Sequence, residues 1–137
     1  MPRSDDLKTT WARVYEAISQ GNIAVLDSLL ARQKEVRIIA TDPQEWWDRA
    51  QFLTVIPGQV EGMGGPFEMR SEALEAHEEG AVGWVADRVT AHLRDGSSVS
   101  FRATGVLHQE DDQWRLVQMH WSIGIANEQA LGTELPT

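Results

Sequence analysis

From Phe67 onward, the chain alternates between apolar and polar residues in long runs separated by short turn sequences. The turn sequences are Glu79-Gly80, Asp95-Gly96-Ser97 and Asp111-Asp112, and they are spaced as consecutive hairpins require. Successive side chains of a strand point to opposite faces of a sheet, so this pattern indicates half-buried antiparallel strands. We therefore expect a four-stranded meander in this half of the chain.

The alternation gives the last three strands one apolar face and one polar face. The polar face carries Trp84, Trp114 and His120 among polar side chains. The apolar set is Val85, Val89, Ala91, Leu93, Val99, Phe101, Ala103, Gly105, Leu107, Val117, Met119, Trp121 and Ile123. Asp87 is the only charged side chain that shares this apolar face within these strands. The apolar face is expected to receive helices, and Asp87 to lie beneath them.

The first third of the chain has the pattern of two helices and a strand. Apolar residues recur at helical spacing from Leu7 to Ile18, and Gly21 ends this first helix. Asn22 can cap a second, shorter helix. The β-branched segment VRIIAT then predicts a strand. The order helix, helix, strand precedes the meander.

A third helix is expected after this first strand. Asp42 precedes Pro43, and this step predicts a helix through QEWWDRAQFL, with Asp42 as the N-cap and Glu45 in the opening turn. Pro57 is expected to kink or split the helix, because proline lacks the N–H that would bond the carbonyl of Leu53. Helices at the front and an antiparallel sheet behind predict an α+β fold.

Composition limits the classes of function. The 137 residues are expected to form one domain, and a net charge of -9 opposes binding to nucleic acid or to anionic membranes. There is no cysteine, hence no disulfide framework or thiolate nucleophile. The start of the chain lacks the apolar segment of a signal peptide, and no run reaches membrane-spanning length. We expect a soluble, cytoplasmic protein.

Three segments carry a family resemblance: ATDPQEWW, GWVADR and WRLVQMHWSIG. From about Leu7 to Asn127 the chain resembles the SnoaL-like domains of the nuclear transport factor two-like (cystatin-like cone) superfamily. The last segment also resembles the end of the association (hub) domain of calcium/calmodulin-dependent kinase, through Trp114, His120 and Ser122. The resemblance implies a single SnoaL-like domain over residues 1–137, with helices packed on a strongly curved antiparallel sheet that forms a cone around an internal pocket.

Two aspartates are the candidate catalytic residues. Asp87 lies among apolar side chains, where a carboxylate is suited to exchange protons near neutral pH. The alternative is a structural role, in which Asp87 pairs with Arg70, Arg88 or a tryptophan N–H. Asp42 is the second candidate, because the related ketosteroid isomerase carries its proton-shuttling aspartate in a similar Asp-Pro step. A helix N-cap is the alternative role for Asp42.

The resemblance also implies a pocket for a hydrophobic ligand, as in ketosteroid isomerase and the polyketide cyclases. Trp47, Phe101, Met119 and Trp121 are the candidate lining residues, and plain core packing is the alternative. Tyr15, as the single phenol, is the candidate donor to an enolate. Gly105 and Trp121 occupy positions where the kinase hub would place arginines, so an anionic ligand of that kind is not expected.

Two classes of function remain open. The first is a small-molecule binder or an isomerase or cyclase acting on an apolar, possibly carbonyl-containing molecule. The second is a non-catalytic association module that pairs through its exposed sheet face, with Trp84 and Trp114 in the contact. A homodimer is expected in either case. The four histidines have no metal-ligand spacing, so neither a metal nor another cofactor is predicted.

Overall fold

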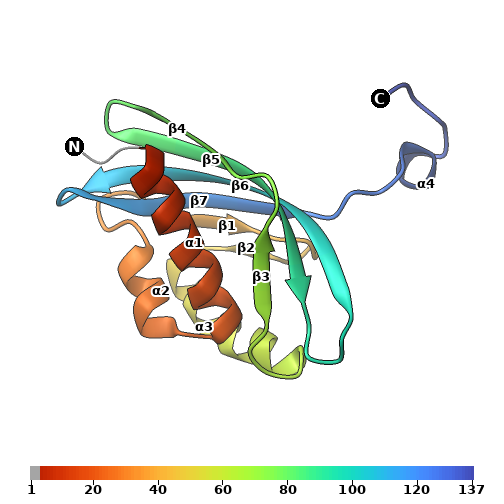
Figure 1. The fold of residues 1–137 in the computed structure, drawn as a ribbon, viewed down its shortest axis with the longest axis horizontal. Helices are drawn as coiled ribbons and strands as arrows, with labels where there is room; N and C mark the ends of the chain where they lie inside the picture. Colours follow the sequence, from red (N-terminus) through yellow and green to blue (C-terminus); the bar gives the residue numbers. More distant parts are fainter. Residues whose placement is uncertain (1–3) are drawn as a thin grey trace.

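The computed structural model describes residues 4–137, with side chains from residue 6 onward. Three helices lie on one face of a curved sheet, as Figure 1 shows. They are α1 (Ser4–Gln20), α2 (Ile23–Leu29) and α3 (Arg49–Gly62). The architecture is the α+β arrangement predicted from the sequence. Gly21 ends α1 with a positive φ of 66°, and the Asn22 side chain caps α2 by accepting from the Val25 N–H, as expected.

The sheet has seven strands, joined in the order β2-β1-β7-β6-β5-β3, with β4 also pairing with β5. The strands are β1 (Arg37–Ile39), β2 (Trp46–Trp47), β3 (Glu68–Ser71), β4 (Glu75–Glu79), β5 (Val82–His92), β6 (Ser98–Glu110) and β7 (Gln113–Ser122). The three predicted turns join β4 to β5, β5 to β6 and β6 to β7. The first strand of the expected meander is divided into β3 and β4, which pair with successive parts of β5. Among the described strands, every pairing is antiparallel except that of β1 with β7, which is parallel, so the sheet is mixed.

Helix α1 lies close to the sheet because the strands beneath it carry glycines. A Cβ at Gly83 would lie 2.7 Å from both Leu7 methyl carbons, and one at Gly105 would lie 2.5 Å from Cζ3 of Trp11. Leu7 and Trp11 are completely buried at these positions. The missing side chains on β5 and β6 therefore create the space into which the helix packs.

A β-bulge changes the face assignment in β7. The register shifts between Val106 and Leu107 of β6, so that Leu107 pairs with Leu116 while Val106 pairs with Gln118. Val117 is the extra residue of β7, and the side chains before it are inverted relative to strict alternation. Trp114 is consequently buried rather than on the polar face. The prediction that Trp114 belongs to an exposed association surface was wrong for this reason.

The third helix begins later than predicted. Residues 42–45 form a turn, Trp46 and Trp47 form β2, and α3 begins at Arg49 with Asp48 as its N-cap. The Asp48 side chain accepts from the Gln51 N–H and the Gln51 side chain accepts from the Asp48 N–H, which is a complete capping box. The expected split at Pro57 is also absent in this described segment, because α3 continues through Pro57 to Gly62.

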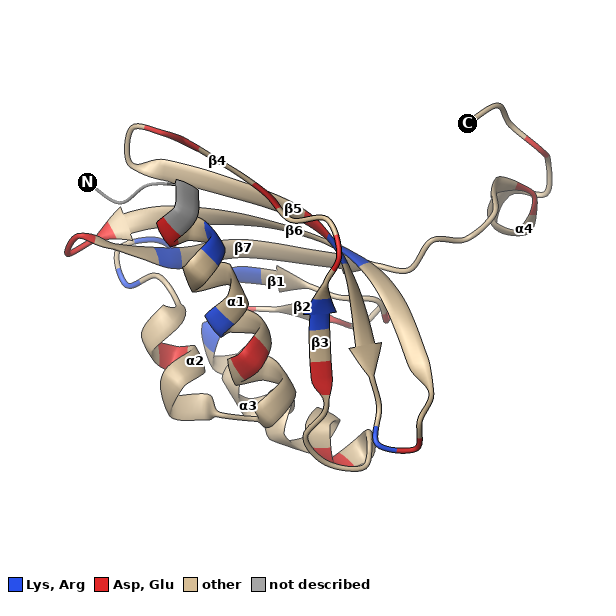
Figure 2. Ribbon diagram, viewed as in Figure 1, with Lys and Arg blue, Asp and Glu red and all other residues tan. Residues whose placement is uncertain are grey.

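The chain ends in an arm that leaves the body of the molecule after β7 and carries α4 (Asn127–Leu131) (Figure 1). None of the residues in α4 is buried. Figure 2 shows acidic and basic positions interspersed along the ribbon, with acidic residues in β4 and at the β6–β7 turn. Within the described part of the chain, no helix is long and apolar enough to cross a membrane.

Candidate functional site

A cavity of about 330 Å³ lies between α3, the end of α1 and the inner face of the sheet. Its walls are mostly apolar and include five aromatic side chains: Trp47, Phe52, Phe67, Phe101 and Trp121. Trp47 stacks on Phe52 with ring centroids 6.0 Å apart, and Phe101 meets Trp121 edge to face at 5.4 Å. The aromatic walls come from β2, α3, the segment before β3, β6 and β7. Distant parts of the sequence thus converge on one apolar space.

Four of the five predicted ligand-contacting residues line this cavity: Trp47, Phe101, Met119 and Trp121. Tyr15 does not line it. Its ring packs edge to face against Trp121, which is a lining residue, with ring centroids 5.6 Å apart. Met119 and Trp121 lie after the bulge in β7. Strict alternation counted back from the C-terminal end of the strand therefore assigns them correctly to the inner face.

The polar groups of the cavity lining are Thr41, Glu45 and Gln59. Glu45 precedes β2 and Gln59 lies on α3, and the Gln59 Nε2 donates to Glu45 Oε2 at 2.6 Å. Glu45 Oε1 accepts from the Asp42 N–H at 2.9 Å. Sequence reasoning assigned Glu45 to a helical first turn and so missed it. The strand alternation of EWW could have found it, because Glu45 and Trp47 then share one side.

Asp87 lies on the inner face of β5, buried beneath α1 as predicted. Its Oδ2 accepts from the Tyr15 hydroxyl at 2.7 Å, and its Oδ1 accepts from the Ala73 N–H at 3.0 Å. These partners differ from the arginines and tryptophan N–H groups that we expected. Burial and the hydrogen bond to Asp87 together raise the pKa of Tyr15 far above its usual value. Neither Asp87 nor Tyr15 lines the cavity.

Asp42 is exposed in the turn before β2. Its Oδ1 accepts from the Gln44 N–H at 2.8 Å, which fixes the turn rather than a helix end. The neighbouring Thr41 and Glu45 line the cavity, but Asp42 does not. The structure therefore does not bring Asp42 and Asp87 together at the cavity, and their catalytic role stays a prediction.

The four histidines are dispersed. His77 stacks on Trp84 with ring centroids 5.8 Å apart, His108 Nδ1 lies 3.4 Å from Glu110, and His120 is exposed as expected. Among the residues that the structure describes, no group of three or more His, Asp or Glu side chains could hold a metal ion.

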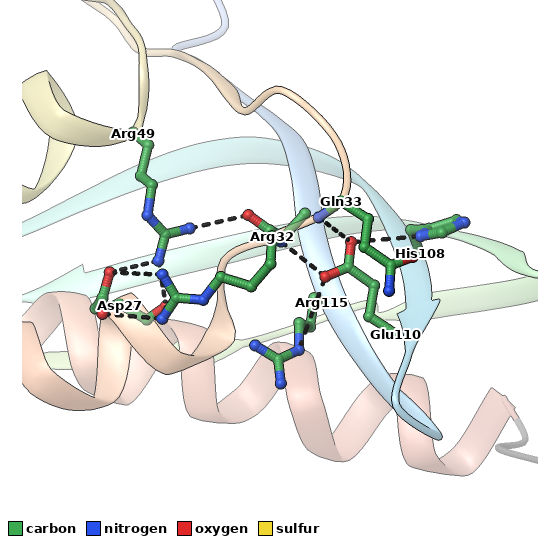
Figure 3. Close-up of polar contacts among 8 residues, drawn as sticks. Asp27, Arg32, Gln33, Arg49, His108, Glu110 and Arg115 are labelled. Carbon is green, nitrogen blue, oxygen red and sulfur yellow. Dashed lines mark hydrogen bonds and ion pairs between the residues drawn. The ribbon is translucent and has the colours of Figure 1, made fainter.

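A polar cluster supports the base of α3 and the loop between α2 and β1, as Figure 3 shows. Arg49, the first residue of α3, forms an ion pair with Asp27 of α2 and donates to the Ala31 carbonyl at 2.9 Å. The buried Glu110 carboxylate accepts from the Arg32 and Gln33 N–H groups at 2.7 and 3.1 Å. These bonds fix the position of α3, which forms one wall of the cavity.

The comparisons with known proteins agree with this architecture. The model of the SnoaL-like domain family matches residues 7–126, and the chain belongs to this family. A comparison with curated proteins found no similar sequence. The fold is similar to that of NTF2-like and cystatin-like proteins with solved structures.

Three of these structures illustrate the likeness. An NTF2-like protein of unknown function from Pseudomonas putida has a TM-score of 0.79 at 15% identity, with 92% of this chain and 89% of that chain covered. A protein provisionally assigned as an NTF2-like dehydratase from Streptomyces avermitilis has a TM-score of 0.75 at 16% identity, with 90% and 96% covered.

The third structure is provisionally assigned as a calcium/calmodulin-dependent protein kinase type II association domain from Thiobacillus denitrificans. Its TM-score is 0.71 at 19% identity, with 86% of this chain and 94% of that chain covered. At these identities the likeness shows the fold alone. The predicted resemblance to the cystatin-like cone and to the kinase hub is confirmed at the level of the fold.

Proposed function

We propose that the chain binds an apolar small molecule in the cavity between α3 and the sheet. The observation that carries this proposal is the unfilled, aromatic-walled space of about 330 Å³ inside the cone. Binding sites for small molecules are typically apolar spaces of roughly 300–1,000 Å³ with a few placed polar groups. Thr41, Glu45 and Gln59 are the polar groups here. Thr41 is exposed and Glu45 is half-buried, so the space can be reached from solvent.

A cavity-filling variant tests this proposal. Ala40 lines the cavity, and Ala40→Phe would place a ring in it. Ala24→Phe on the exposed side of α2 is the matched control. We expect a panel of hydrophobic ketones, steroids and aromatic compounds to include some that raise the melting temperature of the wild type and of Ala24→Phe but not of Ala40→Phe. Absence of any stabilising compound, or equal stabilisation of all three proteins, would contradict the proposal.

Isomerase or cyclase chemistry is a narrower form of the same proposal. Asp87 and Asp42 do not line the cavity, so a proton transfer by Asp87 requires the cavity wall beside it to rearrange in the complex. Asp87→Asn in the same screen separates binding from catalysis. Binding that is unchanged in Asp87→Asn, with turnover of a bound ketone lost, supports an acid or base role; unchanged turnover contradicts it.

Association through the outer sheet face is a second proposal, supported by a separate apolar patch. Trp84 and Val106 are cross-strand partners on that face and are 42% and 36% exposed, and the His77 ring stacks on Trp84. Apolar side chains that adjoin on an exposed sheet face favour pairing with a second copy. Sedimentation of the wild type and of Trp84→Glu tests this. A dimer that dissociates in Trp84→Glu supports it, and a monomeric wild type overturns it.

A further inference from the structure

The charge of the cavity lining favours cationic over anionic ligands. Among the described residues that line the cavity, Glu45 is the only charged one. An anionic group brought into this space would lose its hydration, find no cation and meet a carboxylate. A cationic group would instead be attracted by the Glu45 carboxylate. From this asymmetry we propose that the ligand is an apolar molecule that carries a protonated amine, and that Glu45 binds the ammonium group. The inference rests on the proposed function.

The Glu45 carboxylate is fixed in place without a ligand. Each oxygen already accepts one hydrogen bond, from the Asp42 N–H at 2.9 Å and from Gln59 Nε2 at 2.6 Å. A carboxylate has about four acceptor positions, so each oxygen can accept one more. The two bonds come from a turn and from a helix, and they hold the carboxylate from both sides. A carboxylate held in this way loses little conformational entropy when it binds an ammonium ion.

The aromatic walls suit a cation equally well. Trp47 stands two residues from Glu45, on the strand that follows it, and stacks on Phe52. The face of an aromatic ring carries negative charge density and attracts ammonium groups, with tryptophan the strongest of the rings. A carboxylate in a cavity with aromatic walls can therefore replace much of the hydration that an ammonium group loses, while the apolar walls accept the remainder of the molecule.

A neutral donor would bind less well. An alcohol of the same shape can also donate to Glu45, but it lacks the full positive charge through which an ammonium group is attracted to the carboxylate. A carboxylic acid is ionised at neutral pH and would face Glu45 with like charge. The order of affinity among isosteric amine, alcohol and carboxylate thus reports the charge that the cavity prefers.

The experiment is calorimetric titration with naphthylmethylamine, naphthylmethanol and naphthoate, which share one aromatic body. For the wild type we expect the amine to bind about tenfold more tightly than the alcohol, and the carboxylate to bind weakest. In Glu45→Gln the advantage of the amine over the alcohol should disappear, while the affinity for the alcohol changes little. Glu128→Gln removes the same charge from α4, which lies on the C-terminal arm away from α3 and the sheet (Figure 1), and should retain the wild-type order.

Glu45→Gln is expected to fold. The glutamine carbonyl can still accept from the Asp42 N–H, and the Gln59 amide can rotate to present its oxygen to the new NH₂ group. Near-ultraviolet circular dichroism, dominated by the six tryptophans, verifies the fold of each variant.

The outcomes separate the two proposals. If none of the three probes binds, the proposed function fails and this inference fails with it. If the alcohol or the carboxylate binds as tightly as the amine, the cavity is a binding site but the preference for an amine is wrong. If the preference for the amine persists in Glu45→Gln, the assignment of Glu45 is wrong.

Discussion

The Tyr15 hydroxyl donates a hydrogen bond of 2.7 Å to Oδ2 of Asp87, which joins α1 to β5 across 72 residues of sequence. Both side chains are buried, and the Ala73 N–H supplies the other oxygen of Asp87 with a donor. Each oxygen of the carboxylate thus accepts one hydrogen bond from a neutral donor beneath the first helix. This arrangement gives Asp87 a structural role in docking α1, whatever its part in chemistry.

Tyr15→Phe is expected to lower the free energy of unfolding by about 1–3 kcal/mol, because the buried Asp87 loses a donor while the ring contacts with Trp11 and Trp121 remain. Urea denaturation measures this loss. In an Asp87→Asn background the same substitution should cost less, since no buried charge is left without its donor. Equal costs in the two backgrounds would show that the hydrogen bond contributes little.

Alkaline pH is expected to destabilise the protein through Tyr15. The pKa of its phenol lies above the usual 10.0 in the folded state, mainly because of burial and then because of the bond to Asp87. When the pH rises above the usual pKa of 10.0, the unfolded chain loses the phenolic proton while the folded chain keeps it. The free energy of unfolding therefore falls as pH rises. Tyr15 is the only tyrosine, and its ultraviolet absorbance can be followed directly. Tyrosinate should form only together with unfolding; ionisation of the folded protein near the usual pKa would contradict this.

Acid is expected to destabilise the protein through Glu110. Burial raises the pKa of Glu110, but the Arg32 and Gln33 N–H groups, with His108, outweigh burial and hold it below the usual 4.5. As pH falls below that value, the unfolded chain takes up the proton first, so the stability from this carboxylate is lost as pH falls through its folded pKa. Glu110→Gln should lower stability at neutral pH by about 1–3 kcal/mol and flatten the acid dependence of unfolding. Glu128→Gln, on the exposed arm, should leave both unchanged.

Two glycine substitutions are expected to change the free energy of unfolding in opposite directions. Gly105→Ala forces its Cβ against Trp11 and should destabilise the protein by about 1–3 kcal/mol. Gly58→Ala in α3 meets no atom within 4 Å, and an alanine in a helix interior should stabilise by roughly 0.5–1 kcal/mol. Thermal unfolding of the two variants measures the difference. A neutral Gly105→Ala would mean that α1 shifts away from the sheet at little cost.

The sequence predicts the fold well where turn chemistry is explicit. The hairpins at Gly80, Gly96 and Asp111-Asp112 adopt the positive φ angles that these residues favour, and the strands between them follow. The bulge at Val117 has a weaker signal: the adjacent apolar residues Leu116 and Val117 break the alternation of this strand, and an assignment by strict alternation passes over that break. Trp114 was misassigned as a result.

The sequence alone does not decide which of two candidate N-caps begins α3. Asp42 and Asp48 are each followed three residues later by Glu45 and Gln51, so both segments carry the pattern of a capping box. Both side-chain-to-backbone bonds form, but only the second opens a helix, because residues 46–47 pair with β1 instead. The pairing of β2 with β1 therefore decides between two capping-box segments of equal local strength. As a result, Glu45 lies before a strand and lines the cavity.

The cavity and the hydrophobic core share their walls. Ile38, Phe52, Ile56, Met119 and Trp121 belong to both. A molecule in the cavity would therefore supply packing contacts that the empty protein lacks, and would stabilise the native state in proportion to its concentration relative to its dissociation constant. In a cell that degrades unfolded chains, the amount of this protein would then rise and fall with the supply of its ligand.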